Sequence, residues 1–254
     1  MNRNLKSFYL ILSSLFISLL HLPFAFGKSV TERRVKDKNA VWVSVNDPAL
    51  TEGSHKSVYD SLKLDLAGLS REAFDFAKRG WEKLKTQGRL LNQSVIGIVD
   101  FSQPSSQKRL YVLDMSNYKV LYNTLVAHGR NSGKETATYF SNRTSSYKSS
   151  PGFYITGDTY NGSNGYSLRL DGIEKGINDN ALSRAIVIHG ANYVNESYIA
   201  SRGYIGRSQG CPAVPLKNAK AIINTLKNGA CLYIYAPDQK YLSHSSMLAD
   251  TVNG

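Results

Sequence analysis

A cysteine in a glycine-containing turn is the residue of this sequence best suited to chemistry. Residues 206–215 read GRSQGCPAVP, so Cys211 stands between a glycine and a proline. Backbone N–H groups can converge on one atom in such a turn, because glycine adopts conformations that other residues avoid. A thiol is a useful nucleophile only as the thiolate, and a nearby imidazole promotes that form. The segment indicates nucleophilic catalysis if a histidine lies close to Cys211.

A histidine at the end of an apolar run is the first candidate for that base. His189 lies near the end of the run RAIVIHG at 184–190, and a strand end often presents a functional side chain from a rigid scaffold. We expect His189 to act with Cys211, because one continuous segment contains both; a structural role is the alternative for each. His128 has a similar place in LVAHGRNSG, where it could line the same cleft or serve packing. The histidines outside the predicted strands are His21, His55 and His244.

The second cysteine allows a structural alternative. Exported proteins commonly pair their cysteines, and a Cys211–Cys231 disulfide would remove the nucleophile. Cys231 lies in the apolar run ACLYIYAP, where alternation places it on one strand face with Tyr233 and Tyr235. A small buried cysteine at such a position needs no partner. The sequence is therefore compatible with a disulfide and with two free thiols.

The amino terminus indicates export. Arg3 and Lys6 precede an apolar run at 8–20, and small residues follow at 25–27. This is the pattern of a secretory signal peptide, and the run is shorter than the about 20 residues that span a bilayer. We predict a signal peptide over residues 1–27, cleaved after Gly27, and a mature protein of the periplasm or cell exterior without a membrane segment. A retained N-terminal anchor is the alternative.

The chain is basic. It has 31 Lys and Arg residues against 19 Asp and Glu, a formal net charge of +12. Loss of Arg3 and Lys6 with the signal peptide leaves +10, because residues 1–27 contain no acidic residue. Such a charge suits an anionic polymer of the bacterial envelope, although it can serve solubility alone. No long basic run or zinc spacing favours nucleic acid, and no HExxH or CxxC motif indicates a metal or other cofactor.

One amphipathic helix precedes a series of short strands. Ser70 can cap a helix that ends near Gly88. One face of that helix carries Phe74, Ala77, Trp81 and Leu84. Strands are predicted at 94–101, 109–115, 118–128, 152–158, 165–171, 184–190 and 230–237. A turn at Ser116-Asn117 joins two of them into a hairpin, and a second helix is predicted over 217–229.

This order predicts a mainly β fold. We expect a barrel or sandwich with one or two flanking helices and an N-terminal helical segment. Residues 28–90 are assigned to a polar leader and helical segment, and residues 91–237 to a catalytic domain. Residues 238–254 lack periodicity and are predicted to form a flexible tail.

The histidine and cysteine segments resemble the signature of the L,D-transpeptidase catalytic domain family (YkuD-like). In that family a His-Gly pair is followed by Ser/Thr-His-Gly-Cys. This sequence has His189-Gly190 and then Ser208-Gln209-Gly210-Cys211. The resemblance implies a YkuD-like β barrel or sandwich.

Further segments support the resemblance, which extends over about 94–236. The stretch SSPGFYITG at 149–157 is similar to the family's Thr-Pro-x-Gly-x-Phe strand entrance. The sequence also resembles the branch of murein L,D-transpeptidase catalytic domain proteins, which have segments like AHG, FSN, GYSLRLDG and GCPA. It departs from the family in two places. Gln209 replaces the motif histidine, and PAV follows the cysteine where many members have an apolar residue and then Arg or Asn.

The resemblance implies a role for each matching residue. Cys211 would be the nucleophile and His189 the base, with the carbonyl of Gly190 orienting the imidazole. The N–H groups of Gly210 and Cys211 would form an oxyanion hole. Ser208 would shape the turn.

The implied reaction is acyl transfer on peptidoglycan stem peptides without a cofactor or metal. The thiolate would attack the bond between diaminopimelate and D-Ala, release D-Ala and leave a thioester for an amine or water to resolve. Arg202 and Arg207 could bind a substrate carboxylate or be solvated surface charges, and His128 could contact the substrate. Another Cys-His cell-wall peptidase is one alternative, although papain-like enzymes place the cysteine before the histidine. A non-catalytic peptidoglycan-binding protein on the same fold is the other, and the departures at Gln209 and Ala213 keep it open.

Overall fold

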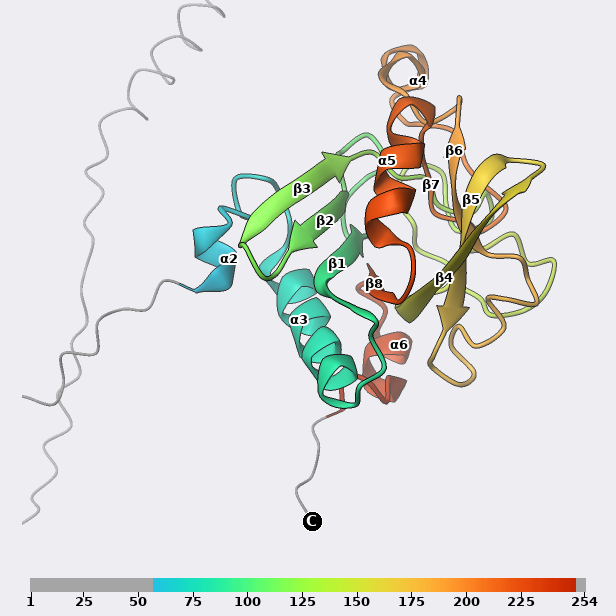
Figure 1. The fold of residues 1–254 in the computed structure, drawn as a ribbon. Coiled ribbons are helices and arrows are strands. Elements are labelled where there is room, and N and C mark those ends of the chain that lie inside the picture. Colours follow the sequence, from blue (N-terminus) through green and yellow to red (C-terminus); the bar gives the residue numbers. More distant parts are fainter. Residues whose placement is uncertain (1–56, 250–254) are drawn as a thin grey trace, which may run out of the picture. The chain divides into compact units, whose positions relative to one another are not determined.

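The computed structural model describes residues 57–249, so the predicted signal peptide and the leader up to residue 56 lie outside the described residues. Helices α2 (Val58–Ser61) and α3 (Arg71–Thr86) precede strands β1 (Asn92–Asp100), β2 (Leu110–Asp114), β3 (Lys119–Thr124), β4 (Gly152–Gly162) and β5 (Gly165–Gly172). There follow β6 (Val187–Ala191), α4 (Glu196–Arg202), β7 (Ala213–Pro215), α5 (Leu216–Leu226), β8 (Ala230–Tyr235) and α6 (Gln239–His244) (Figure 1). None of these helices is long and apolar enough to cross a membrane.

The strands of the described chain form one sheet in the order β3-β2-β1-β8-β4-β5-β6-β7. The pairs β1–β8 and β6–β7 are parallel, and the other neighbours are antiparallel. A bridge from Ala127, just after β3, to Ala213 in β7 brings the two edges together, so the sheet is almost closed. The predicted mainly β fold and the predicted hairpin of β2 and β3 are thereby confirmed.

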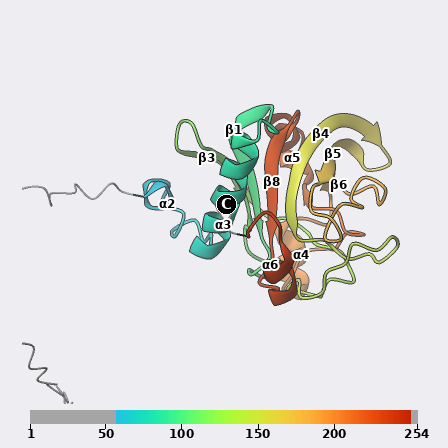
Figure 2. The same ribbon diagram turned by 90° about the horizontal axis from the view of Figure 1, so that it is seen from below.

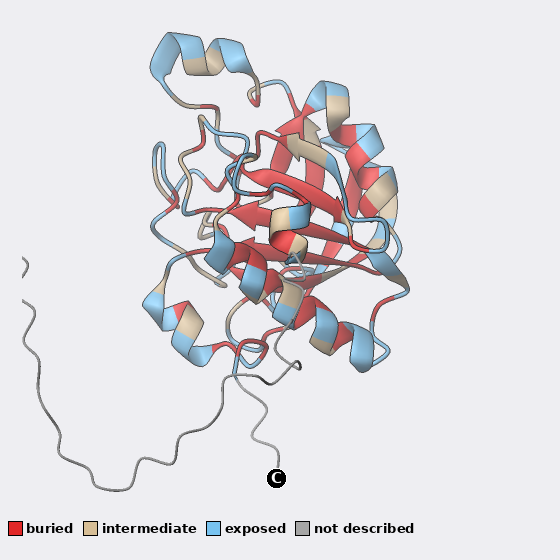
Figure 3. Ribbon diagram, turned by 90° about the vertical axis from the view of Figure 1, so that its left-hand side faces the viewer, coloured by how far each residue is buried: buried red, intermediate tan, exposed pale blue. Residues whose placement is uncertain are grey.

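Alternate residues of the central strands face two separate cores. In β8, Cys231, Tyr233 and Tyr235 point into the core beneath α3, as the alternation predicts, whereas Leu232 and Ile234 point into the core beneath α5. Figure 3 shows the result: the central strands β1 and β8 are largely buried, and helices α3 and α5 are buried on the side that faces the sheet.

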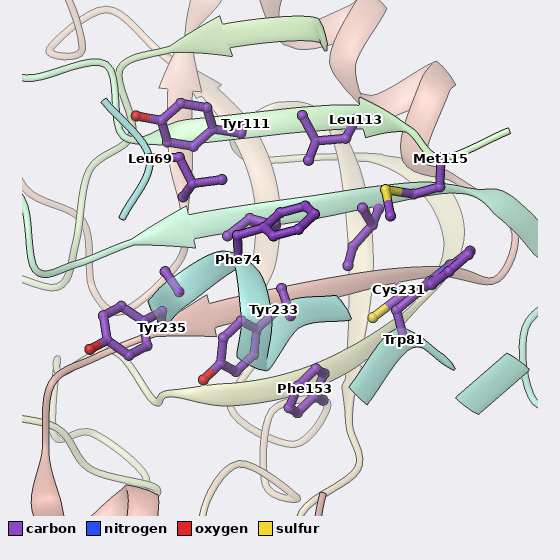
Figure 4. Close-up of a cluster of buried hydrophobic side chains, with 14 of the residues drawn as sticks. Leu69, Phe74, Trp81, Tyr111, Leu113, Met115, Phe153, Cys231, Tyr233 and Tyr235 are labelled. Atoms are coloured by element: carbon purple, nitrogen blue, oxygen red, sulfur yellow. The ribbon is translucent and has the colours of Figure 1, made fainter. Parts of the chain in front are cut away.

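Helix α3 covers the first core. Ser70 caps it as predicted, since its Oγ accepts the N–H of Ala73 at 3.2 Å. Phe74 and Trp81 pack in this core with Phe153 and other side chains of the sheet (Figure 4). The apolar face of an amphipathic helix needs such a partner. The described part of the predicted leader, up to residue 90, therefore shares its core with the predicted catalytic domain.

Helix α5, predicted at 217–229, packs on the opposite face and covers the second core. Its buried residues are Ala219, Ile222, Ile223 and Leu226. Close packing there depends on Gly97 in β1, because a Cβ at that position would lie 2.8 Å from Leu232 and 3.3 Å from Leu226. The glycine thus lets the helix approach the sheet closely.

The prediction of a flexible tail over 238–254 is wrong for the described residues 238–249. Asp238 caps α6, and Tyr241, Met247 and Leu248 join the first core, against which α3 also lies (Figure 2). Ser245 Oγ donates a hydrogen bond to the buried Glu174 carboxylate. A helix of six residues is too short to give a recognisable apolar period, so the sequence pattern missed it.

The contact between α3 and the sheet can be tested at Gly80. A Cβ there would lie 2.1 Å from the ring of Phe153, which stacks on Tyr233 with ring centroids 4.2 Å apart. Replacement by alanine adds about 1 kcal/mol of helix propensity, but overpacking costs about 1–3 kcal/mol. We expect Gly80→Ala to lower the free energy of unfolding in urea by up to about 2 kcal/mol, because the difference of the two terms is about 0–2 kcal/mol. Asp75→Ala, on the exposed face of α3, is the control and should change it by less than about 0.5 kcal/mol.

Candidate active site

Cys211 lines a cleft of about 650 Å³ together with His189, Gln209 and Arg207. The thiol is half-buried in a turn just before β7. The N–H of Val187 donates to its Sγ at 3.5 Å, and the S–H group points to the carbonyl oxygen of Ala185 at 3.6 Å. Cys231 is fully buried in β8, and both thiols are free, so the Cys211–Cys231 disulfide does not form.

Hydrogen bonds within the turn fix the position of the thiol. Ser208 Oγ donates to the carbonyl oxygen of Cys211 at 2.6 Å and accepts the N–H of Gly210 at 3.0 Å. The N–H of Ser208 donates to the carbonyl oxygen of His128 at 2.9 Å. Gly210 has φ +126°, and a Cβ there would lie 2.8 Å from the carbonyl oxygen of Lys148. Ser208 therefore contacts both ends of the turn, and only glycine fits at position 210.

The same bonds correct the predicted oxyanion hole. The N–H of Gly210 is directed to Ser208 Oγ inside the turn, so it does not face the cleft as a free donor. The N–H of Cys211 lies beside the thiol, where it lowers the thiol pKa. Of the two predicted donors, the backbone N–H of Cys211 can therefore still bind an oxyanion, whereas that of Gly210 cannot.

Strand β6 presents the candidate base to the cleft. His189 is 4% exposed, and β6 places it between Ser167 of β5 and Ala213 of β7. Its Nδ1 lies 3.0 Å from the carbonyl oxygen of Gly190, which can only accept a hydrogen bond. Nδ1 therefore carries the proton in the neutral ring, and Nε2 carries the lone pair. Within the described chain, no hydrogen bond joins His189 to Cys211 directly.

The environment favours the uncharged forms of both groups. Burial raises the pKa of the Cys211 thiol above 9.0, and the nearby Val187 N–H and Arg184 guanidinium offset only part of this. Burial lowers the pKa of His189 below 6.5, although its bond to Gly190 acts in the other direction. At neutral pH the resting pair is therefore a thiol and a neutral imidazole.

Arg184 is a cleft residue that the sequence analysis did not identify. Its guanidinium donates to the carbonyl oxygens of Ser141 at 2.9 Å and Lys148 at 2.6 Å, and to Ser150 Oγ at 2.6 Å. It therefore holds the loop before β4 against the cleft and places a positive charge near the thiol of Cys211. The only sequence signal was an arginine at the start of the run that leads to His189.

The predicted substrate-binding residues lie in three different environments. Arg207 lines the cleft, where its guanidinium donates to the carbonyl oxygens of Arg130 at 3.2 Å and Gly133 at 3.0 Å. Arg202 lies at the end of α4, where its guanidinium stacks 4.3 Å from the ring centroid of Tyr198, and it does not line the cleft. Its predicted contact with substrate is not supported by this position.

His128 is a structural residue rather than a substrate contact. It is fully buried, and Arg109 donates to its Nδ1 at 2.7 Å while its Nε2 faces the carbonyl oxygen of Gly133 at 3.3 Å. Burial, and then the charge of Arg109, lower the pKa of His128 to about 3. The neutral ring fixes the segment after β3, in which the carbonyl oxygen of His128 accepts the N–H of Ser208. Of the two alternatives for His128, its position supports packing, because His128 is not among the residues that line the cleft.

Comparison with known protein families now identifies the fold family. The model of the L,D-transpeptidase catalytic domain family matches residues 65–235. The chain belongs to this family. The match begins at residue 65, within the predicted leader of residues 28–90. This agrees with the structure, in which α3 shares a core with the sheet. A comparison with curated proteins gave no significant match. Within residues 57–249, no group of three or more His, Cys, Asp or Glu side chains could hold a metal ion.

Solved L,D-transpeptidase structures are similar at low sequence identity. An L,D-transpeptidase from Mycobacterium smegmatis is 14% identical over 56% of this chain and 59% of its own, with a TM-score of 0.35. The L,D-transpeptidase from Stackebrandtia nassauensis is 14% identical over 72% of this chain and 77% of its own, also with a TM-score of 0.35. The helical cell shape determining protein Pgp2 from Campylobacter jejuni is 14% identical over 57% of this chain and 49% of its own, with a TM-score of 0.37. This chain thus spans less than two thirds of the Mycobacterium and Campylobacter proteins.

The neutral resting pair can be tested by alkylation. In native protein, iodoacetamide should modify Cys211 and leave the buried Cys231 unmodified, as peptide mass spectrometry can establish. Because burial raises the pKa of Cys211, the alkylation rate should keep rising with pH up to and beyond 9.0. In the Arg184→Gln variant, the increase of the alkylation rate should occur at higher pH, since the charge that stabilises the thiolate is lost. A rate that is already at its plateau at neutral pH would instead indicate a thiolate–imidazolium pair.

Proposed function

We propose that this chain is an L,D-transpeptidase that acts on peptidoglycan stem peptides through Cys211. Membership of the family supports a peptidoglycan-modifying enzyme. The observation that carries the proposal is the pair formed by a free thiol and a neutral imidazole on one cleft. The basic sequence and the predicted signal peptide suit work on an anionic polymer in the cell envelope.

The first half of the reaction forms a thioester. The S–H group turns away from the Ala185 carbonyl, and Nε2 of His189 takes its proton. Sγ of Cys211 then attacks the carbonyl carbon between the L-centre of diaminopimelate and D-Ala. The N–H of Cys211 donates to the oxyanion of the tetrahedral intermediate. The C–N bond breaks, His189 returns the proton to the leaving amine, and D-Ala departs.

The second half resolves the thioester. The amine of a second stem peptide attacks the thioester carbonyl and gives its proton to His189. The C–S bond breaks, and Cys211 regains a proton. A diaminopimelate amine yields a 3-3 cross-link, and water yields a shortened stem peptide. Gln209 stands at the cleft where most members have histidine, and this route does not use it, because His189 alone accepts and returns the proton.

Unpaired arginines in the cleft suit an anionic peptide. Arg130, Arg184 and Arg207 line it, while no Asp or Glu does so and no acidic side chain of the described chain lies within salt-bridge distance of them. Arg130 stacks on Tyr147 with its guanidinium 4.0 Å from the ring centroid. Arginine pairs well with carboxylates, which stem peptides have in free form.

The thioester mechanism can be tested by intact mass. Wild-type protein mixed with purified disaccharide-tetrapeptide should show a transient adduct and release D-Ala. Cys211→Ser should show neither, and His189→Gln should lose at least about 100-fold in the rate of D-Ala release, because the base is removed. A folded wild-type protein with a free Cys211 that forms no adduct and releases no D-Ala would favour the non-catalytic peptidoglycan-binding alternative.

A matched pair of arginine variants tests carboxylate recognition. Arg207→Gln should raise KM for disaccharide-tetrapeptide about three- to tenfold with little change in kcat, because it removes a charge from the cleft but no reacting group. Arg202→Gln removes the same charge from α4 and should leave KM unchanged. Equal effects of the two variants would show that net charge matters and that the position of Arg207 does not.

A further inference from the structure

A hollow of about 700 Å³ lies beside the first core, between helices α2 and α3 and the hairpin of β2 and β3. Trp81 of α3 and Met115 at the end of β2 line it, and both belong to that core. Gln93 at the start of β1 and Tyr118 in the hairpin turn line it as well. The hollow and the Cys211 cleft have no lining residue in common, so the hollow is a separate feature of the molecule.

The indole N–H of Trp81 has no partner in the described chain. Trp81 is 8% exposed, and its Nε1 is buried without a hydrogen bond. A buried tryptophan usually finds an acceptor for this group, because an unsatisfied buried donor costs free energy. Lys85, whose side chain is exposed, lies over the ring with its Nζ 5.0 Å from the ring centroid. Movement of that flexible side chain gives an acceptor on a ligand access to the indole.

Tyr118 gives the hollow a second aromatic side chain. It is 54% exposed, so its ring is available to a ligand. Its φ of +51° lies in the left-handed region, which a bulky residue rarely adopts. Backbone strain of this kind is often found where a protein binds a ligand. The exposed ring offers a flat apolar surface, and its hydroxyl offers a donor and an acceptor.

The polar lining of the hollow suits an uncharged ligand. Lys78 Nζ and Glu82 Oε1 lie 2.7 Å apart, so these two charges offset each other. Gln93 Nε2 donates to the carbonyl oxygen of Leu90 at 3.3 Å, and its Oε1 accepts no hydrogen bond within the described residues. An indole N–H, an amide oxygen and two aromatic rings therefore meet at one hollow. Such a set fits hydroxyl and amide groups better than a carboxylate.

We propose that this hollow binds an uncharged N-acetyl amino sugar of a peptidoglycan glycan strand. The face of the sugar ring that presents C–H groups lies on the ring of Tyr118. The acetamido carbonyl oxygen accepts the N–H of Trp81, and Oε1 of Gln93 accepts a sugar hydroxyl. The site holds the glycan strand and takes no part in the chemistry at Cys211. The identity of the polymer rests on the proposed function.

The test follows the indole N–H signal of Trp81 in the full-length protein by nuclear magnetic resonance. The chain has two tryptophans, Trp42 and Trp81, and Trp81→Phe assigns their signals by the loss of one. The probe is a linear tetramer of N-acetylglucosamine, which has no charge and no stem peptide to react at Cys211. It should shift the Trp81 signal downfield to saturation, because the N–H gains an acceptor, and leave the Trp42 signal in place. A change from about 50 to about 500 mM NaCl should leave the affinity unaltered, since no charge is bound.

Disaccharide-tetrapeptide tests the source of the sugar. Added to the Cys211→Ser protein, it should shift the same Trp81 signal and compete with the tetramer, because it contains the same amino sugar. The substitution prevents a thioester, so the signal reports binding alone.

Matched aromatic variants sharpen the test. Tyr118→Gly should weaken binding of the tetramer about three- to tenfold, because the stacking surface is lost. Its midpoint of urea unfolding should stay close to that of the wild type, because glycine adopts a positive φ without strain and this offsets the lost contacts. Tyr139→Ala removes a tyrosine that is 63% exposed but lies outside the hollow, and it should leave the affinity unchanged. Trp81→Phe keeps an aromatic ring without the N–H and should weaken binding about three- to tenfold in calorimetry.

Each outcome separates this site from the transpeptidase proposal. An unmoved Trp81 signal, or equal effects of Tyr118→Gly and Tyr139→Ala, would overturn the sugar site and leave D-Ala release at Cys211 untouched. A shift with disaccharide-tetrapeptide but not with the tetramer would show that the hollow binds the peptide, and the reverse would overturn the assignment to peptidoglycan. Sugar binding in a protein that releases no D-Ala would support the hollow and count against the transpeptidase proposal.

Discussion

The parallel pairing of β6 with β7 is the constraint on which the candidate site depends. It sets His189 opposite Ala213, so the imidazole lies one strand away from the segment that begins with Cys211. Parallel strands cannot be joined by a tight turn and need a crossover of about a dozen residues or more. The long insert between the histidine and the cysteine, with α4 in it, is that crossover. The parallel direction of the two strands therefore requires a long segment between His189 and Cys211.

Buried polar groups hold the other side of the thiol turn. Arg109 is fully buried and donates to the carbonyl oxygen of Val126 as well as to His128. Burial lowers the pKa of Arg109 to about 9, which shows how strongly the site disfavours charge. The strand that this pair supports presents the carbonyl oxygen that fixes Ser208. A neutral His128 and a buried Arg109 thus act on the position of Cys211 through the backbone.

Much of the fold could be predicted from the sequence, because apolar alternation and turn residues are local signals. The strand face shared by Cys231 and Tyr233, the hairpin of β2 and β3 and the cap at Ser70 all follow from such signals. The helix α6 could not be predicted, because a six-residue helix shows no period. The strand β7 was missed for the same reason, since its three residues gain their order from β6.

The candidate site was less predictable, because its chemistry depends on long-range contacts. The motif indicated Cys211, His189 and Ser208. It could not show that the N–H of Gly210 donates to Ser208 Oγ within the turn. It left open whether His128 lines the cleft or packs: both histidines are buried, but His189 lines the cleft and His128 does not. Arg184 belongs to no motif of the sequence. Its role depends on hydrogen bonds to a loop more than thirty residues earlier, which no local pattern reveals.

Under the proposed function, the charge pattern of the cleft would let a neutral thiol and imidazole act on an anionic stem peptide. A preformed thiolate near a peptide rich in carboxylates would repel its substrate, and the arginines of the cleft would pair with the thiolate instead of the peptide. With a neutral thiol, the charges of Arg130 and Arg207 stay available for the substrate until it is bound. In the proposed reaction, a bound substrate would displace water from the cleft, which would strengthen the interaction of any developing charge with the Cys211 N–H and Arg184. The raised thiol pKa and the unpaired arginines are thus two parts of one electrostatic arrangement.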